Sequence, residues 1–233
     1  MSEVFLRVDE PAGAARAVAL VLHGGRSTST APVRANQLAV LRMLPFVGSL
    51  RRAGAQHGLA VARLRYRVRG WNGAERSPVA DVESVLDRLV TRFPDVPIAL
   101  VGHSMGGRAA LYAAGHDAVR SVVGLAPWVE PGDPMNQLLG RRLLVAHGRA
   151  DRMTDPRESA RYTAAAAAVA ASASYVAVDG DRHAMLRRAA LWHGLATGFV
   201  LATLLDVAPG ESVGGDPANL VVKALDGTAE ISA

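Results

Sequence analysis

The segment that most constrains the fold is residues 97–115, which read PIALVGHSMGGRAALYAAG. Its first residues, 98–101, form an apolar run typical of a buried strand, and residues 108–114 form an alanine-rich run typical of a helix. Only a few residues, three of them glycine, separate the two runs. The chain must therefore turn sharply from a strand into a helix, with Ser104 at the turn.

The turn itself, residues 102–106, matches the pattern G-x-S-x-G. In this pattern a serine lies on a strained strand-to-helix turn, and its hydroxyl is exposed above the sheet. The glycines are required because a side chain at either position collides with the neighbouring strand and helix. A serine that only caps a helix is the alternative interpretation. The strand before the pattern and the helix after it favour a nucleophile.

The whole chain alternates apolar runs with longer segments of helical periodicity, which is the signature of repeated βα units. We predict strands over residues 3–8, 16–22, 60–66, 98–101, 121–125, 142–146 and 174–178, and helices over residues 38–57, 79–92, 105–116, 156–171 and 184–205. The pattern therefore predicts an α/β fold with a mostly parallel, doubly wound sheet flanked by helices.

The sequence divides into one catalytic domain, residues 1–205, and a C-terminal tail, residues 206–233. The chain of 233 residues is long enough to bury one substantial core. The last segment is rich in glycine, proline and acidic residues and has no sustained apolar period. We therefore expect the tail to be flexible or loosely docked.

Composition narrows the possible chemistry and partners. The chain has no cysteine, which excludes a disulfide framework and a thiolate nucleophile and leaves serine as the nucleophile to look for. The net charge of +5 comes from arginines spread along the chain, because Lys223 is the only lysine. Without a basic block or a nucleic-acid motif, we predict no nucleic-acid partner.

Several expected absences follow from the same survey. No apolar run is long enough to span a bilayer, and the N-terminal residues are acidic and strand-like, so we expect no membrane partner and a cytoplasmic location. Histidine pairs and carboxylate clusters at metal-ligand spacing are missing, and no phosphate-binding glycine loop follows the early strands. We therefore predict that no metal and no organic cofactor takes part.

A serine hydroxyl needs a base within hydrogen-bond reach, and that base is oriented by a carboxylate. Asp151 follows the predicted strand 142–146, and His183 follows the predicted strand 174–178. Because the carboxyl ends of parallel strands share one edge of the sheet, Ser104, Asp151 and His183 are expected to converge there.

Other histidines and acids were weighed for the same roles. Of the seven histidines, His183 alone follows both the serine and a strand-end acid. The remaining six are interpreted as structural, solvated or capping residues: His23, His57, His103, His116, His147 and His193. For the acid, Asp133 and Glu130 remain alternatives to Asp151, because geometry and not sequence position defines the role.

An oxyanion that forms at the reacting carbon needs preorganised backbone N–H donors. Such donors come from the residue after the nucleophile and from a loop after an early strand, which nominates Met105 and Gly25. A simple glycine turn at residues 23–25 is the alternative interpretation.

A row of arginines suggests where the substrate binds. Arg67 and Arg69 continue an alternating series that begins at Arg63 and Arg65, and their strand runs toward the catalytic edge. They could bind an anionic or polyhydroxylated substrate by charge-assisted hydrogen bonds, whereas an exposed or salt-bridged face is the alternative. The candidate substrate-binding residues are Arg26, Arg67, Arg69 and Trp128.

In their order along the chain, HGG at 23–25, GHSMGG at 102–107, HGRAD at 147–151 and GDRH at 180–183 resemble the α/β-hydrolase family of serine hydrolases. The resemblance covers about residues 1–205. It implies Ser104 as the nucleophile, His183 as general base and acid, Asp151 as the orienting carboxylate, and Gly25 and Met105 as oxyanion donors. It does not identify a substrate.

The resemblance also implies a reaction. Many members of the family carry a lid at the position of residues 129–141, but those thirteen residues are too few for one, so a minimal or absent lid is expected. An open site favours a small soluble acyl substrate: a carboxylic ester, thioester or amide cleaved through an acyl-enzyme. The alternatives are an acyltransferase with the same triad and a non-catalytic ligand-binding protein. The sequence leaves the oligomeric state open.

Overall fold

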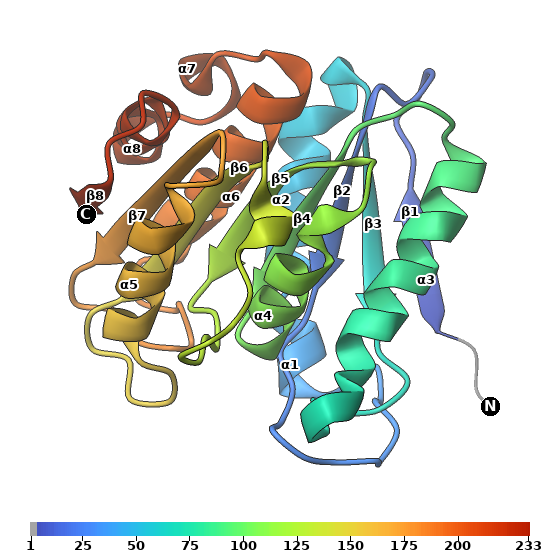
Figure 1. The fold of residues 1–233 in the computed structure, drawn as a ribbon. Coiled ribbons are helices and arrows are strands. Elements are labelled where there is room, and N and C mark those ends of the chain that lie inside the picture. Colours follow the sequence, from blue (N-terminus) through green and yellow to red (C-terminus); the bar gives the residue numbers. More distant parts are fainter. Residues whose placement is uncertain (1–3) are drawn as a thin grey trace.

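An eight-stranded sheet forms the centre of the protein, which a computed structural model describes over residues 4–233 (Figure 1). The strand order is β1-β3-β2-β4-β5-β6-β7-β8, and only β1 runs antiparallel to its neighbour. The strands are β1 (Phe5–Asp9), β2 (Ala17–Leu22), β3 (Leu59–Arg65), β4 (Ile98–His103), β5 (Val119–Leu125), β6 (Arg142–Gly148), β7 (Ser172–Val178) and β8 (Glu230–Ser232). The mostly parallel α/β sheet expected from the sequence is confirmed.

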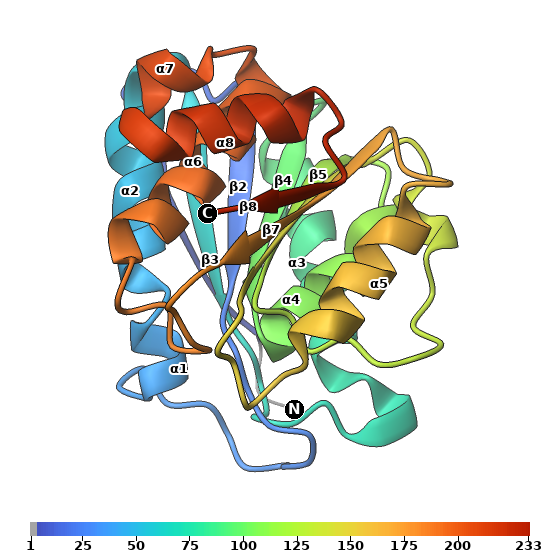
Figure 2. The same cartoon turned by 90° about the vertical axis from the view of Figure 1, so that its left-hand side faces the viewer.

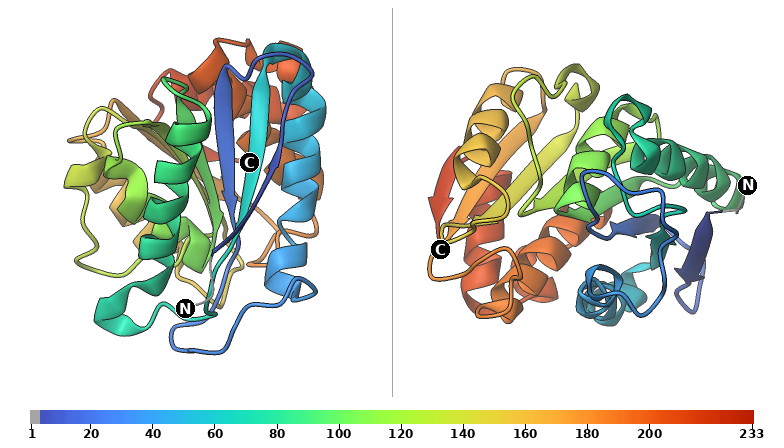
Figure 3. Two further views of the ribbon diagram at one scale, coloured as in Figure 1. Left: turned by 90° about the vertical axis from the view of Figure 1, so that its right-hand side faces the viewer. Right: turned by 90° about the horizontal axis from the view of Figure 1, so that it is seen from below.

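Helices cover both faces of the sheet, with α3, α4 and α5 on one side and α2, α6 and α8 on the other (Figures 2 and 3). Side chains alternate along the central strands. In β2, Leu20 packs on the side of α3, α4 and α5, and Val21 packs on the side of α2, α6 and α8. Successive residues of a strand point to opposite faces of the sheet. The helices are α1 (Leu38–Leu41), α2 (Leu44–Gly54), α3 (Ser77–Arg92), α4 (Met105–Tyr112), α5 (Pro156–Ala166), α6 (Ala189–Leu205), α7 (Pro209–Ser212) and α8 (Gly215–Leu225).

The predicted elements agree with the structure except at particular boundaries. All seven predicted strands are present, although Glu3, the first residue of the first one, lies outside the described residues. The predicted helix over residues 38–57 is divided into α1 and α2. Pro45 lies in the first turn of α2, where a residue without a backbone N–H begins a helix more readily than it continues one.

Helix α6 is apolar on all sides, and packing explains this. It lies on the sheet and also contacts α2 and α8, so both its inner and its outer face are buried. Over residues 4–233, none of the helices has the combination of length and hydropathy that crossing a bilayer requires.

The C-terminal segment, residues 206–233, differs from the flexible or loosely docked tail that the sequence suggested. It forms α7, α8 and β8, and β8 extends the sheet by pairing in parallel with β7. In α8, Leu220, Val221 and Ala224 are buried on one helix face. This face covers the second side of the sheet, so apolar burial holds the segment in place.

Residues 129–141 form no lid. Between β5 and β6 the chain makes one short 3-10 turn, Asn136–Leu138, and then enters β6. The carboxyl edge of the sheet is therefore not covered by an insertion at this position, as the sequence predicted.

Docking of the C-terminal segment can be tested at Ile231, which is 4% exposed in β8. Replacement of Ile231 by alanine is expected to lower the free energy of unfolding by about 2–3 kcal/mol, because a buried branched side chain leaves a cavity. Chemical denaturation measures the change. The matched control is Val222→Ala on the exposed face of α8, which is expected to cost less than about 1 kcal/mol. If the C-terminal segment were detached from the sheet, neither substitution would change the free energy of unfolding.

Candidate active site

Ser104 lies at a strained turn between β4 and α4. Its backbone has φ 55° and ψ −120°, a conformation that residues other than glycine rarely adopt. The turn is fixed because the Ser104 N–H donates to the carbonyl of Leu125, and the Ser104 carbonyl accepts from the N–H groups of Arg108 and Trp128. The strain is therefore balanced by β5 and by the loop that follows it.

Close backbone contacts explain the glycines of this turn. A Cβ on Gly106 would lie 2.5 Å from the carbonyl oxygen of His23 and 2.7 Å from that of Leu22. A Cβ on Gly102 would meet the backbone of Gly106. Helix α4 thus begins in direct contact with the end of β2, as the sequence pattern predicted.

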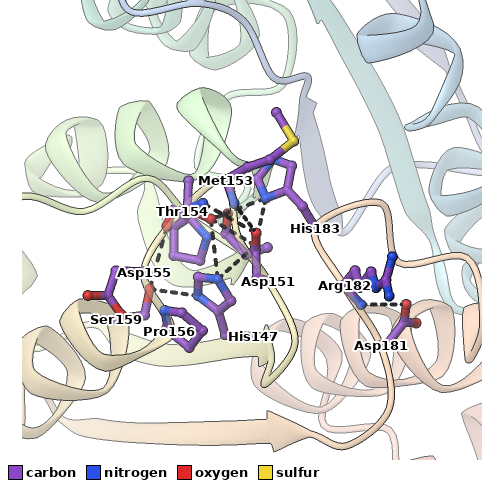
Figure 4. Close-up of polar contacts among 12 residues, drawn as sticks. His147, Asp151, Met153, Thr154, Asp155, Pro156, Ser159, Asp181, Arg182 and His183 are labelled. Carbon is purple, nitrogen blue, oxygen red and sulfur yellow. Dashed lines mark hydrogen bonds and ion pairs between the residues drawn. The ribbon is translucent and has the colours of Figure 1, made fainter.

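His183 and Asp151 meet at the carboxyl edge of the sheet (Figure 4). His183 Nδ1 lies 2.7 Å from Asp151 Oδ2 and donates its proton there, since a carboxylate only accepts. In the neutral ring this leaves Nε2 unprotonated. His183 and Ser104 line one cavity of about 560 Å³, and within residues 4–233 the Ser104 hydroxyl has no hydrogen-bond partner.

The two alternative acids lie elsewhere. Asp133 accepts from Arg108 Nη2 at 2.6 Å and from the Tyr112 hydroxyl at 2.7 Å, and Glu130 accepts from the same Arg108 nitrogen at 2.8 Å. The geometry therefore selects Asp151 as the carboxylate that contacts His183.

Asp151 is held by more donors than the sequence suggested (Figure 4). Its Oδ2 also accepts from His147 Nε2 and from the Thr154 hydroxyl, each at 2.9 Å, and its Oδ1 accepts from the Met153 N–H at 2.8 Å. Burial opposes the charged form of this carboxyl. The hydrogen bonds from His147, His183 and Met153 outweigh burial and hold the pKa of Asp151 well below its usual range.

His147 contacts Asp151 directly, whereas the sequence predicted only a structural role for it. Its ring is fully buried, and its Nδ1 lies 2.9 Å from the hydroxyl of Ser159 on α5. Because Nε2 donates to Asp151, Nδ1 accepts from Ser159, which fixes the tautomer of the ring. The spacing of four residues between His147 and Asp151, across the tight turn after β6, is the signal that could have identified the pair.

Two contacts position the loop that carries His183. His103 Nε2 lies 3.0 Å from the carbonyl oxygen of His183 and donates to it. Burial and the neighbouring His183 lower the pKa of His103 to about 3, so its ring is neutral. Asp181 accepts from the Arg188 N–H at 3.0 Å and from the Trp192 indole N–H at 2.9 Å. The residues before Arg188 therefore form a loop, and α6 begins at Ala189, not at residue 184 as the sequence predicted.

Gly25 and Met105, the expected oxyanion donors, line the cavity that contains Ser104. In the described part of the chain, neither backbone N–H forms a hydrogen bond. The loop of Gly25 is fixed by His23, whose Nδ1 donates to the carbonyl of Gly24 at 2.7 Å and whose Nε2 accepts from the Tyr66 N–H. Burial lowers the pKa of His23 to about 4, which keeps this ring neutral as well.

The four candidate substrate-binding residues do not all border the same cavity. Arg26 and Trp128 line the cavity that contains Ser104. Arg69 lines a smaller neighbouring cavity of about 210 Å³. Arg67 differs from the expectation: its Nε donates to buried Asp81 at 2.5 Å, so this ion pair turns its side chain to α3, and Arg67 is not among the residues that line the catalytic cavity.

A metal site is not evident among residues 4–233, where no three histidine, aspartate or glutamate side chains gather as ligands of one ion.

The close packing of α4 on β2 gives a first test of the site. Replacement of Gly106 by alanine is expected to lower the free energy of unfolding by about 3 kcal/mol or more, because the added Cβ overlaps two carbonyl groups. Urea denaturation measures the loss. Gly48→Ala is the matched control, since a Cβ on this α2 residue meets nothing within 4 Å and alanine favours a helix. A Gly106→Ala protein as stable as the control would contradict the packing.

The hydrogen bonds to Asp151 give a second test through pH. A carboxyl with a depressed folded pKa stabilises the protein above its unfolded pKa of about 4, and this contribution is lost as the pH falls through the folded value. The stability difference between the wild type and Asp151→Asn should be constant from neutral pH down to about 5 and then shrink in acid. Asp117→Asn, at an exposed position, is the control. A difference that grows on acidification contradicts the assignment.

Comparisons with known proteins bear on part of the sequence and on the fold. A sequence model of the family described as serine aminopeptidase, S33, matches residues 57–143, which include β4 and Ser104. Among proteins of curated function, none matches the sequence.

Solved structures match most of the chain. A serine hydrolase without a lid from Xanthomonas campestris has 20% identity and a TM-score of 0.63, over 88% of this chain and 90% of its own. A serine hydrolase homologue from Coxiella burnetii has 18% identity and a TM-score of 0.61, over 83% and 90%. Est1E from Butyrivibrio proteoclasticus, solved with ferulic acid bound, has 14% identity and a TM-score of 0.63, over 86% and 95%. The chain thus has the α/β-hydrolase fold and resembles the serine hydrolases, lidless ones included, that share it.

Proposed function

We propose that this protein is a serine hydrolase that cleaves carboxylic esters, or related thioester and amide bonds, of small soluble substrates through an acyl-enzyme. One observation carries the proposal: the half-buried Ser104, the His183 ring that donates to Asp151, and the unpaired backbone N–H groups of Gly25 and Met105 belong to residues that border one cavity. Nucleophile, base and oxyanion donors are the parts that acyl transfer requires.

In the proposed acylation step, Ser104 Oγ attacks the carbonyl carbon of the substrate while His183 Nε2 accepts the hydroxyl proton. Asp151 orients the ring and stabilises the imidazolium that forms. The N–H groups of Gly25 and Met105 donate to the oxyanion. Collapse of the tetrahedral intermediate breaks the bond to the leaving group, which takes the proton from His183.

Deacylation repeats these steps with water as the nucleophile. Water gives a proton to His183 Nε2 and attacks the acyl carbon, and the second intermediate expels Ser104 Oγ, which recovers its proton from His183. The surrounding hydrogen bonds suit this cycle, because Asp151 stays ionised while His183 gains and loses a proton.

The shape of the cavity supports a small substrate. Its volume is about 560 Å³, and no insertion follows β5. Neighbours of the fold include proteins named as esterase PE8 and as a monoacylglycerol lipase from Paleococcus ferrophilus, at 16% and 15% identity. These names agree with an ester substrate. An acyltransferase would use the same residues, and product analysis with added alcohols separates transfer from hydrolysis.

Substitutions of the two reacting side chains test the proposal. Ser104→Ala and His183→Ala are each expected to lower kcat by about 10⁴-fold or more on a short p-nitrophenyl ester, because nucleophile and base act as one unit. For the same reason the double variant should be little worse than either single one. Steady-state kinetics measures all three.

His57→Ala is the matched control, since this histidine lies at the surface after α2 and is expected to keep full activity. A Ser104→Ala protein that retains more than about a tenth of the wild-type kcat would reject the mechanism.

A further inference from the structure

A second cavity adjoins the catalytic one. It has a volume of about 450 Å³ and shares Ser27, Thr28 and Trp128 with the cavity that contains Ser104. We call it the arginine cavity, because Arg76 and Arg108 line it. Since these three residues border both cavities, the arginine cavity lies directly beside the one that contains Ser104.

Arg108 forms a rigid part of this wall. Its guanidinium carbon lies 4.5 Å from the ring centre of Trp71 and 4.6 Å from that of Trp128, so two indole rings hold it. One of its nitrogens, Nη2, donates to both Asp133 and Glu130. The side chain is therefore fixed before any ligand binds.

Arg108 also has unused donors. The residue is 5% exposed, yet its Nε–H is a buried donor without an acceptor in the described part of the chain. Within residues 4–233 its Nη1 forms no hydrogen bond either, whereas Nη2 forms two. A buried donor without a partner costs free energy, and an acceptor oxygen from a ligand would satisfy it.

Arg76 supplies a second cation at the same cavity. Its guanidinium lies over the ring of Tyr112, 5.1 Å from the centre, and pairs with no carboxylate of residues 4–233. Its backbone is left-handed, with φ 46°. The loop is held in this form by Asn72, which accepts from the Ser29 N–H at 2.9 Å and donates to Ser77 Oγ at 3.1 Å.

We propose that the arginine cavity binds a carboxylate at the far end of the acyl chain, so that the preferred substrates are monoesters of dicarboxylic acids. This inference rests on the proposed function and names its substrate class. Arg76 would form a charge-assisted pair with the carboxylate, and Nη1 of Arg108, which is not fully buried as Nε is, would donate to one of its oxygens. We assign the carboxylate to the acyl part because that part stays on Ser104 through both steps, whereas the leaving group departs after the first.

The surrounding charges agree with an anionic ligand. Glu130 is the carboxylate among the residues that line the arginine cavity, and it shares the single positive charge of Arg108 with buried Asp133, which leaves one negative charge unbalanced. Arg26, on the catalytic side, forms no ion pair within the described residues. The two cations without an ion pair, Arg26 and Arg76, outweigh this negative charge; the sequence suggested Arg26 but not Arg76.

Kinetics with matched esters tests the proposal. We compare p-nitrophenyl monoesters of adipic and suberic acid with the neutral hexanoate and octanoate, for the wild type and for Arg76→Gln. The wild type should have a KM at least about tenfold lower for each monoester than for its neutral match. Arg76→Gln should raise the KM of the monoesters about tenfold and leave that of the neutral esters within about twofold. High salt should reduce the preference.

The matched control is Arg120→Gln, which removes the same charge at the amino end of β5, on the opposite edge of the sheet. It should leave every KM unchanged. Equal KM values for charged and neutral esters, or a monoester KM that does not respond to Arg76→Gln, would overturn the inference and leave the proposed hydrolase function intact.

A binding measurement tests the carboxylate site independently of the proposed hydrolase activity. Calorimetry with monomethyl adipate uses the Ser104→Ala protein, which cannot turn the ligand over, with and without Arg76→Gln. The inference predicts affinity about tenfold weaker when Arg76 is replaced. Unchanged affinity overturns it. If the wild type hydrolyses no ester while Arg76-dependent binding persists, the proposed function fails and the carboxylate site stands.

Discussion

The contact between the start of α4 and the end of β2 is the constraint on which the rest of the site depends. Gly106 lies so close to the carbonyls of Leu22 and His23 that no Cβ fits. This contact forces Ser104 into its strained backbone conformation, because the chain must leave β4 and enter α4 without a longer loop. It also places the N–H of Met105 beside the loop of Gly25, where both donors border the same cavity.

A second constraint is the ionised carboxyl of Asp151, which is buried at the edge of the sheet. A buried charge is tolerated only when its hydrogen bonds are satisfied, and here two histidines, a threonine and a backbone N–H supply them. Ser159 then fixes the tautomer of His147, and His103 fixes the loop of His183. His183 is thus positioned by its contacts with Asp151 and His103, and its Nε2 has no hydrogen-bond partner in the described part of the chain.

The sequence predicted those features of the site that depend on residues close together along the chain. The turn at Ser104 needs glycine on both sides, and Asp151 and His183 follow apolar runs that can only be strands, so their shared edge could be inferred. Three features could not be. Strand β8 is three residues long, and the apolar face of α8 is too short to show a period. The roles of the arginines depend on partners distant in sequence: Arg67 pairs with Asp81, whereas Arg108 is held between Trp71 and Trp128.

Covalent labelling by a fluorophosphonate tests most directly whether Ser104 is an activated nucleophile, as we propose. The probe reacts with a serine whose proton is removed by a neighbouring base. We expect one adduct per chain, located on Ser104 by peptide mass spectrometry. Labelling should slow sharply in Asp151→Asn, because His183 loses the partner that orients it. An unlabelled wild-type protein, or an adduct on any other residue, would contradict it.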